Sequence, residues 1–232
     1  MNERELFSLR GRSRLAGLFL LLATVALYVS QRVVGASATV VDIQSHDTAY
    51  DWAGAVNLIG VCLTIAAVTL LDDILRPVNA RLSRLAAFVA FVGCVIQAFM
   101  NVFLYGALWM ATGTPYREAF YLRQYQALAH LLLSLYQDGY LVTIVFFGLY
   151  GVLIGYFTRR SGLLPNLVAE LVVVLALGCV MWALPALAGW SPIIATASGF
   201  SAQLTLSIAL LAMGLNERRW KIEAYFQPRI VA

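Results

Sequence analysis

The amino-acid sequence predicts an all-α membrane protein, folded as one polytopic bundle of six transmembrane helices. Of the 232 residues, 61% are hydrophobic and 12% are charged, whereas a soluble domain is about 45–50% apolar and about 25% charged. Four uncharged apolar stretches also reach the roughly 20 residues that a helix needs to cross a bilayer. They are Trp52–Leu71, Leu85–Ala111, Gly139–Thr158 and Leu171–Asn216, and the last has room for two crossings and a turn.

The six predicted spans lie at residues 15–34, 52–71, 85–111, 139–158, 164–186 and 193–215, within a single domain that covers residues 1–232. The first span follows four arginines, Arg4, Arg10, Arg12 and Arg14. A basic segment before an apolar run is also the pattern of a secretory signal peptide. Because small residues that suit cleavage appear only at 36–38, we expect an uncleaved first span, with cleavage there as the alternative.

Turn-forming and charged residues separate the other spans in order. Proline, glycine and asparagine favour turns between helices, and Pro165 suits the first turn of the fifth span. The separating segments are 72–79 (DDILRPVN), 113–115 (GTP), 159–162 (RRSG), 185–192 (PALAGWSP) and 216–221 (NERRWK). The residues after 221 are predicted to form a short tail.

The segment before the fourth span allows two structures. Tyr121, Tyr125, Leu128, Leu132 and Leu135 recur at helical spacing and give the segment one apolar stripe. A single helix from 118 to 158 would be roughly 60 Å long at about 1.5 Å per residue, about twice the thickness of the hydrocarbon layer. The sequence therefore predicts either a break near Gly139 or a helix that protrudes far beyond the membrane. We favour the break, with an extra amphipathic or interfacial helix at about 118–137.

The distribution of basic residues predicts the orientation. With the N-terminus in the cytoplasm, thirteen of the sixteen Lys and Arg residues lie inside and three, Arg32, Arg117 and Arg123, lie outside. Cytoplasmic loops carry the excess of Lys and Arg. The pattern predicts that both termini are cytoplasmic. Because the net charge of +4 is spread over membrane edges and forms no single patch, we expect no nucleic-acid partner.

Several short motifs resemble those of a known family. They are Leu75-Arg76-Pro77-Val78-Asn79, Phe146-Phe147-Gly148-Leu149, Gly155-Tyr156 and 160–165 (RSGLLP). Together they resemble a family of bacterial six-span membrane proteins that is catalogued only as a domain of unknown function. The resemblance runs from the first span to the sixth and implies the fold and a multi-pass location in the bacterial cytoplasmic (inner) membrane, but no reaction. The chain departs from the family pattern in the loop 35–51, and it has Tyr136 and Tyr150 where that pattern often has histidine.

Polar residues within the spans are the candidate site, because uncompensated polar groups are costly in lipid. Gln97, Asn101 and Tyr105 share one face of the third span, while Asp138 and Tyr140 open the fourth. We expect some of these side chains and His130 to converge in the outer half of the bundle. The candidate ligand-binding residues are Gln97, Asn101, Tyr105, His130, Asp138, Tyr140 and Glu170. The alternative is that they only form interhelical hydrogen bonds, that Asp138 caps a helix, and that Glu170 pairs with Arg159 or Arg160.

Other residues favour structural roles. Gly148, Gly151 and Gly155 lie on nearly one face of the fourth span and predict a close helix contact. Cys62, Cys94 and Cys179 all lie inside predicted spans and form no CxxC pair, so we interpret them as packing residues. The two histidines cannot hold a haem between spans because His46 lies in a loop. A metal site from His46, Asp42 and Asp47 is a weak alternative, and we expect no cofactor and no bound metal.

Three functions compete. The favoured one is a non-catalytic bundle that binds a lipid or lipophilic small molecule or acts as an accessory subunit of a membrane complex. Its partners would be membrane lipid and a membrane-protein partner or further copies of the chain. The second is a membrane enzyme that acts on a lipid or quinone-like substrate with Asp138 or Glu170 as acid or base. The third is a small transporter. No Gly-rich phosphate loop, HExxH or GxSxG motif is present.

Overall fold

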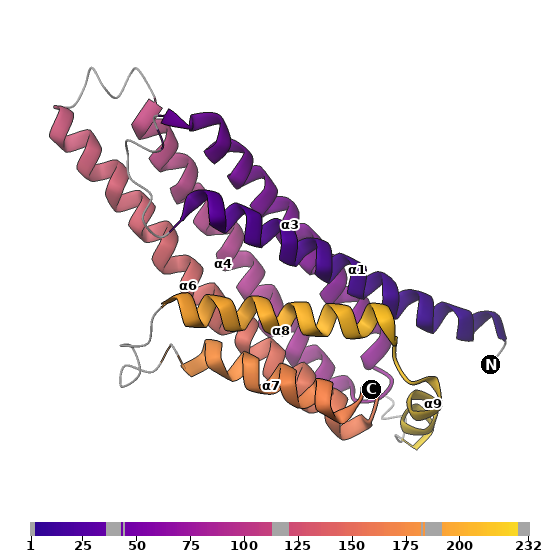
Figure 1. The fold of residues 1–232 in the computed structure, drawn as a ribbon. Coiled ribbons are helices and arrows are strands. Elements are labelled where there is room, and N and C mark those ends of the chain that lie inside the picture. The colour runs from indigo at the N-terminus through magenta and orange to yellow at the C-terminus, as the bar shows by residue number, and fades with distance from the viewer. Residues whose placement is uncertain are drawn as a thin grey trace.

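The structure is a computed structural model that describes residues 3–35, 43, 45–112, 121–181, 183 and 192–226. All regular secondary structure within these residues is helical (Figure 1). The helices are α1 (Glu3–Val34), α3 (Asp47–Leu75), α4 (Ala80–Thr112), α6 (Leu122–Ser161), α7 (Asn166–Met181), α8 (Pro192–Ala212) and α9 (Glu217–Phe226). The all-α fold class is therefore confirmed.

Five of these helices, α1, α3, α4, α6 and α8, are long and apolar enough to cross a membrane. The protein is accordingly a membrane-embedded helical bundle. The fifth predicted span coincides with α7, which is apolar but has 16 residues, about 24 Å against a hydrocarbon layer of about 30 Å. The last part of that predicted span, residue 182 and residues 184–186, lies outside the described residues.

The segment before the fourth span is not a separate helix. Residues 122–161 form α6, one helix of 40 residues, without a break at Gly139. The predicted break near Gly139, and with it a helix separate from the fourth span, is therefore not found. In this segment the buried face also differs from the predicted apolar stripe, because Tyr121 is 82% exposed and Leu135 is 41% exposed. The buried side chains of the segment, Tyr125, Ala129, Leu133 and Tyr136, continue in register along the helix, and the last three join a core with residues of α4. Gly139 continues the contact, since a Cβ atom there would collide with Met100 of α4.

The six longest helices form a closed ring. Each packs against the next along the chain, from α1 and α3 through α4, α6 and α7 to α8, and α8 then packs against α1. Consecutive helices run antiparallel (Figure 1). One end of the ring, called here the basic end, contains the start of α1, the α3–α4 and α6–α7 turns and α9. Arg10, Arg76, Arg159 and Arg218 all belong to these segments. The axis of the ring is consequently enclosed by all six helices.

Glycines set the closest contacts in the ring. A Cβ atom on Gly148, Gly151 or Gly155 would lie 2.6–2.8 Å from side-chain carbons of α7, which confirms the predicted contact of that face. Gly178 of α7 in turn lies against Ser198 of α8, and Gly17 of α1 lies against Leu210 of α8. Small residues let helix backbones approach and gain van der Waals contact, which must drive helix association where lipid is already apolar.

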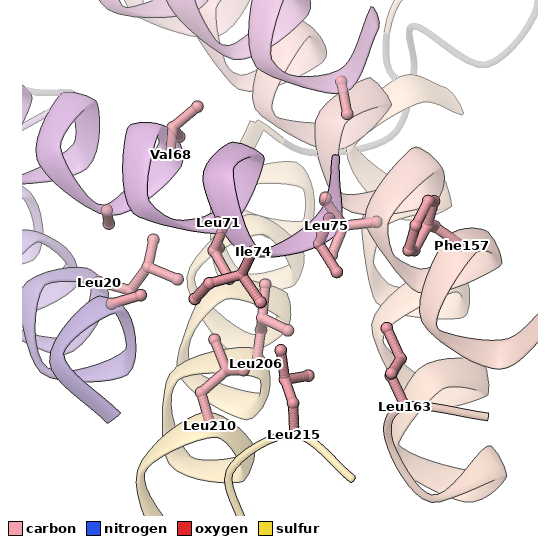
Figure 2. Packing of buried hydrophobic residues seen from close by; sticks show 14 of the residues in the cluster. Leu20, Val68, Leu71, Ile74, Leu75, Phe157, Leu163, Leu206, Leu210 and Leu215 are labelled. Atoms are coloured by element: carbon pink, nitrogen blue, oxygen red, sulfur yellow. The ribbon is translucent and has the colours of Figure 1, made fainter. Parts of the chain in front are cut away.

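The largest buried cluster lies toward the basic end. It joins Leu20 of α1, Leu71 and Leu75 of α3, Phe157 of α6 and Leu210 of α8 (Figure 2). Helix α9 closes this end, where the sequence predicted only a tail. The indole Nε1 of Trp220 in α9 donates a hydrogen bond of 2.8 Å to the carbonyl oxygen of Ile74, so α9 is attached to the end of α3.

Candidate functional site

An amide cluster links three helices of the ring. Asn57 of α3 accepts two hydrogen bonds at Oδ1, from Nε2 of Gln97 and from Nδ2 of Asn101, each 3.0 Å long. Its own Nδ2 donates to the hydroxyl of Ser30 in α1 at 3.3 Å. All four side chains are at most 2% exposed. The cluster connects α1, α3 and α4 inside the bundle, where hydrogen bonds between helices are one of the main sources of association.

The cluster leaves two amide oxygens without a partner in the described part of the chain. They are Oε1 of Gln97 and Oδ1 of Asn101, and a third buried oxygen, the hydroxyl of Tyr150 in α6, is likewise unpaired. A buried polar atom without a hydrogen bond costs about 1–3 kcal/mol. Such atoms are therefore places where a water molecule or a ligand group would be bound favourably.

Gln97 and Tyr150 both line a cavity on the axis of the ring. Residues from all six ring helices contribute to the wall, including Leu27 of α1, Ala176 of α7 and Ala202 of α8. Along α6 the wall runs from Tyr140 to Gly151, a length of about 16 Å at about 1.5 Å per residue. The cavity is thus elongated along the bundle.

The cavity is narrow and mostly apolar. It offers about 60 Å³ to the centres of water-sized spheres, and one water molecule needs roughly 10–15 Å³ by this measure, so about four to six waters would fill it. The polar residues in its wall are Thr64, Gln97, Tyr140, Tyr150, Cys179, Thr196 and Gln203. An apolar wall with a few well-placed polar groups is typical of sites for small organic ligands.

The position of Gln97 along the cavity follows from the register of α4 and α6. Gly93 of α4 lies against Phe146 of α6, and Gly139 of α6 lies against Met100 of α4. Gln97, which stands between Gly93 and Met100, is therefore opposite the segment 139–146 of α6. This segment contains Tyr140, so these two polar residues share the end of the cavity farther from the basic end.

Additional hydrogen bonds tie α1 to α6 across the ring, beyond the amide cluster. Nε2 of Gln31 donates to the hydroxyl of Tyr136 at 3.0 Å, and Nε2 of Gln137 donates to the carbonyl oxygen of Gly35 at 2.8 Å. Tyr136 is completely buried. These contacts fix the end of α1 against α6 and limit how far the bundle can open there.

The chain matches the family described as "Domain of unknown function (DUF4386)" over residues 15–215. This match covers most of the chain and all six ring helices in whole or in part. The chain belongs to this family. The resemblance inferred from the sequence motifs is thereby confirmed. No curated protein and no solved structure matches this DUF4386 chain.

Of the predicted site residues in this DUF4386 protein, three lie at the amide cluster or the cavity. Gln97 and Asn101 join at Asn57, and Tyr140 lines the cavity with Gln97. Tyr105 lies farther along α4, where its ring packs against Gly54 of α3. Ligand binding by these residues stays a prediction.

The other three predicted residues do not join them. Asp138 and His130 are exposed on α6, so the expected convergence with buried Asn101 in the outer half of the bundle is not found. His130 Nδ1 lies 3.4 Å from the hydroxyl of Ser134 on its own helix. Glu170 is half-exposed and forms an ion pair of 3.1 Å with Arg159, which agrees with the structural interpretation of that carboxylate.

Sequence reasoning missed Asn57 and the unpaired hydroxyl of Tyr150. Asn57 was detectable, because it is the one amide side chain in the apolar stretch Trp52–Leu71 and intramembrane polar residues are costly. Tyr150 was noted only as a departure from the family pattern, although a tyrosine in the middle of the predicted span 139–158 is also an intramembrane polar residue. Among the described residues no three His, Cys, Asp or Glu side chains are grouped to hold a metal ion. Asp42, part of the weak metal alternative, lies outside the described residues.

Proposed function

We propose that this DUF4386 protein is a non-catalytic bundle that binds one lipophilic small molecule or lipid chain in its axial cavity. The observation that carries the proposal is an apolar cavity on the axis of the ring, lined by residues of six helices that include Gln97 and Tyr150, each of which has a buried oxygen without a partner in the described residues. A ligand that supplies those hydrogen bonds removes a cost of about 1–3 kcal/mol for each atom.

The cavity favours a particular ligand chemistry. Its narrow, elongated form suits a short unbranched alkyl segment better than a compact ring system, and at about 60 Å³ a longer chain would have to extend out of the cavity or widen it. Oε1 of Gln97 only accepts hydrogen bonds, whereas the hydroxyl of Tyr150 can donate or accept. A chain that carries a hydroxyl or amide N–H group near Gln97 and an oxygen acceptor near Tyr150 would satisfy both atoms.

The setting of the site is also proposed. The positive-inside pattern supports six crossings of a bacterial cytoplasmic membrane with both termini in the cytoplasm. In that orientation the Gln97 end of the cavity faces the outer leaflet. An accessory role in a larger membrane complex, or assembly of several copies, is compatible with the ligand-binding role; the exposed apolar side chains of α4, such as Phe88, Val95 and Val102, would face lipid or such a partner.

An enzymatic function has less support. Asp138 and Glu170, the carboxylates considered as acid or base, are exposed and do not line the cavity. A general acid or base must reach the proton that it transfers within hydrogen-bonding distance. Neither residue is placed to act on a molecule bound on the axis of the ring.

The proposal is tested by filling the cavity. Ala202 of α8 lines the cavity and is buried, whereas Leu204 on the same helix is 40% exposed and does not line it. We expect native mass spectrometry of protein purified in mild detergent to detect one lipophilic molecule on the wild type and on Leu204→Phe. Ala202→Phe should lose it while keeping the helical circular dichroism spectrum. If Ala202→Phe retains the molecule at the same occupancy as Leu204→Phe, the axial cavity is not the binding site.

A further inference from the structure

A second concave site lies at the basic end of the bundle. Three segments that are distant in sequence form a groove of about 540 Å³ there. They are Arg10 of α1, the α6–α7 turn at 162–165 and the α8–α9 turn at 213–218. The groove is open to the surface and shares no wall residue with the axial cavity.

The walls of the groove are held in place by backbone contacts. The N–H of Asn216 donates a hydrogen bond of 3.0 Å to the carbonyl oxygen of Leu163, which joins the two turns. Each turn contains a glycine with positive φ, Gly162 at +62° and Gly214 at +64°, a conformation that residues with a Cβ atom rarely adopt. Both glycines line the groove. The groove is therefore a formed feature of the fold, and binding there needs little reorganisation.

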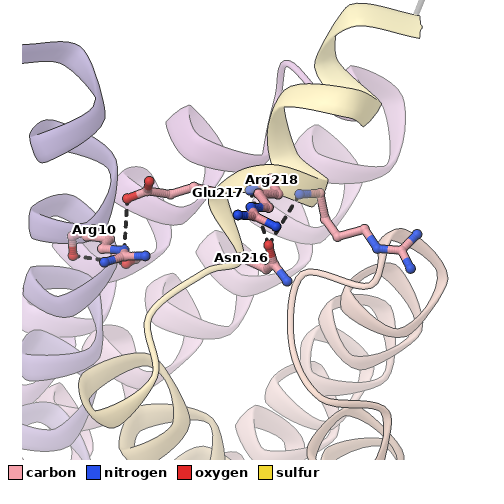
Figure 3. Close-up of polar contacts among 6 residues, drawn as sticks. Arg10, Asn216, Glu217 and Arg218 are labelled. Carbon is pink, nitrogen blue, oxygen red and sulfur yellow. Dashed lines mark hydrogen bonds and ion pairs between the residues drawn. The ribbon is translucent and has the colours of Figure 1, made fainter. Parts of the chain in front are cut away.

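One of the two arginines that line the groove forms an ion pair, and the other forms none in the described part of the chain. Nε of Arg10 forms an ion pair of 2.9 Å with Glu217 (Figure 3). Glu217, the one carboxylate in the groove wall, is thus already neutralised. Arg218, which also lines the groove, forms no ion pair within the described residues and is exposed. The neighbouring Arg219 lies near the same turn, since a Cβ atom on Gly162 would be 3.7 Å from its Cδ and Nε.

The side chain of Arg218, and not the N-terminal end of α9, is the group that can bind an anion. The first backbone N–H groups of α9 are already capped, because Oδ1 of Asn216 accepts from the N–H groups of Arg218 and Arg219 at 3.1 and 3.3 Å (Figure 3). The guanidinium of Arg218 keeps its own donors, which suit the paired oxygens of a phosphate group. The groove thus presents a net positive charge with directional donors.

The other half of the groove is apolar. The exposed apolar side chains of its wall are Pro165 and Met213, which lie where the apolar helices α7 and α8 begin and end. Leu163, Leu164 and Leu215 also line the groove, but they are at most 3% exposed and belong to the buried core. A soluble anion would make no favourable contact with these apolar side chains. An amphiphile with an anionic head and hydrocarbon chains complements both halves, and anionic lipids attract basic segments at the cytoplasmic surface of membranes.

We propose that this groove binds the headgroup phosphate of an anionic phospholipid, with Arg218 as the contacting cation and the apolar half against the start of an acyl chain. This site is independent of the proposed ligand of the axial cavity. It would hold the basic end of the bundle, including α9, against one leaflet.

The test uses the full-length protein in detergent, titrated with phosphatidylglycerol and, separately, with phosphatidylcholine, while native mass spectrometry counts bound lipid. We expect preferential binding of phosphatidylglycerol to the wild type. Arg218→Gln should weaken it roughly fivefold, which corresponds to the loss of one basic contact near a lipid surface. Lys221→Gln is the matched control, because Lys221 is an exposed cation of the same helix that does not line the groove; we expect less than a twofold change.

A second variant keeps the test informative. Met213→Asp places a negative charge in the apolar half of the groove at a residue that is 58% exposed, and it should also reduce phosphatidylglycerol binding.

An equal loss in Lys221→Gln and Arg218→Gln would show diffuse attraction and overturn the proposal. Wild-type affinity in Arg218→Gln would do the same. Displacement of the lipid by millimolar inorganic phosphate would assign the groove to a free anion instead. Ala202→Phe in the axial cavity should leave phosphatidylglycerol binding unchanged.

Discussion

At the residue scale, one asparagine organises the polar interior. Asn57 bonds to α4 through two amide groups and to α1 through a serine hydroxyl. Its partners Gln97 and Asn101 are 40 and 44 residues away in the sequence. A hydrogen bond between transmembrane helices contributes on average about 0.6 kcal/mol and up to about 1.7 kcal/mol. The three bonds of Asn57 together therefore contribute about 2 kcal/mol on average, and the unpaired oxygens of Gln97 and Asn101 offset part of that gain.

Replacing Asn57 by Ala should destabilise the folded protein by about 1–3 kcal/mol, because the amide groups of Gln97 and Asn101 lose their shared acceptor. Reversible unfolding in mixed micelles measures this change. Thr69→Ala is the control on the same helix: its hydroxyl bonds only to the carbonyl of Ile65 one turn away. We expect that variant to change stability by less than about 0.5 kcal/mol. Similar losses in both variants would argue against an organising role for Asn57.

At the element scale, α6 is the central helix of the fold. Its 40 residues contact α4 along one face and α7 along another, and it also touches α8 across the ring. The contact with α7 uses three glycines in succession, Gly148, Gly151 and Gly155. Helix α7, which is 16 residues long, thus packs closely against the glycine face of α6. Close packing against α6 therefore contributes van der Waals contact to a helix that has few residues of its own.

Gly155→Ala should therefore be destabilising. The added Cβ atom would lie 2.6 Å from Cγ2 of Val173 and 3.0 Å from the carbonyl oxygen of Ala169, and overpacking of a tight contact costs about 1–3 kcal/mol. Gly11→Ala in α1 is the matched control, since a Cβ atom there meets nothing within 4 Å. Alanine in a free helical position should stabilise by up to about 1 kcal/mol. Thermal unfolding in detergent compares the two; a neutral effect of Gly155→Ala would mean that the α6–α7 contact can relax.

At the scale of the whole molecule, the arginines and the ring give the bundle two unlike ends. The basic end contains the cationic groove, the start of α1 and α9 (Figure 1). The opposite end contains the end of α1 and the starts of α3 and α6 (Figure 1). If the positive-inside pattern governs insertion, the groove faces the cytoplasm and the residue Ser45, which is exposed between α1 and α3, faces the exterior.

An impermeant thiol reagent should detect this orientation in intact cells. In a Cys62→Ala background the remaining cysteines, Cys94 and Cys179, are buried. Ser45→Cys should react before lysis, and Lys221→Cys in α9 should react only after it, because the bilayer separates the two sites. The opposite pattern would invert the bundle and place the groove on the outer surface.

The sequence by itself determined the membrane location, the helical class and the approximate limits of most spans. It also determined the close-packed glycine face of α6. These features follow from local composition and periodicity, because a bilayer selects apolar segments of a given length. A pair such as Arg159 and Glu170 was likewise foreseeable, since both residues flank one short turn.

Only the tertiary structure decided how the faces of the helices meet. The contact of α8 with α1 closes the ring around the axial cavity, while the packing of α1, α3 and α4 forms the amide cluster. The same packing keeps α6 continuous through Gly139, where its own sequence was compatible with a break. It also exposes Asp138 and His130 while it buries Asn57 and Tyr150. Which polar side chains meet depends on contacts between residues far apart in the chain, and a local pattern carries no information about such contacts.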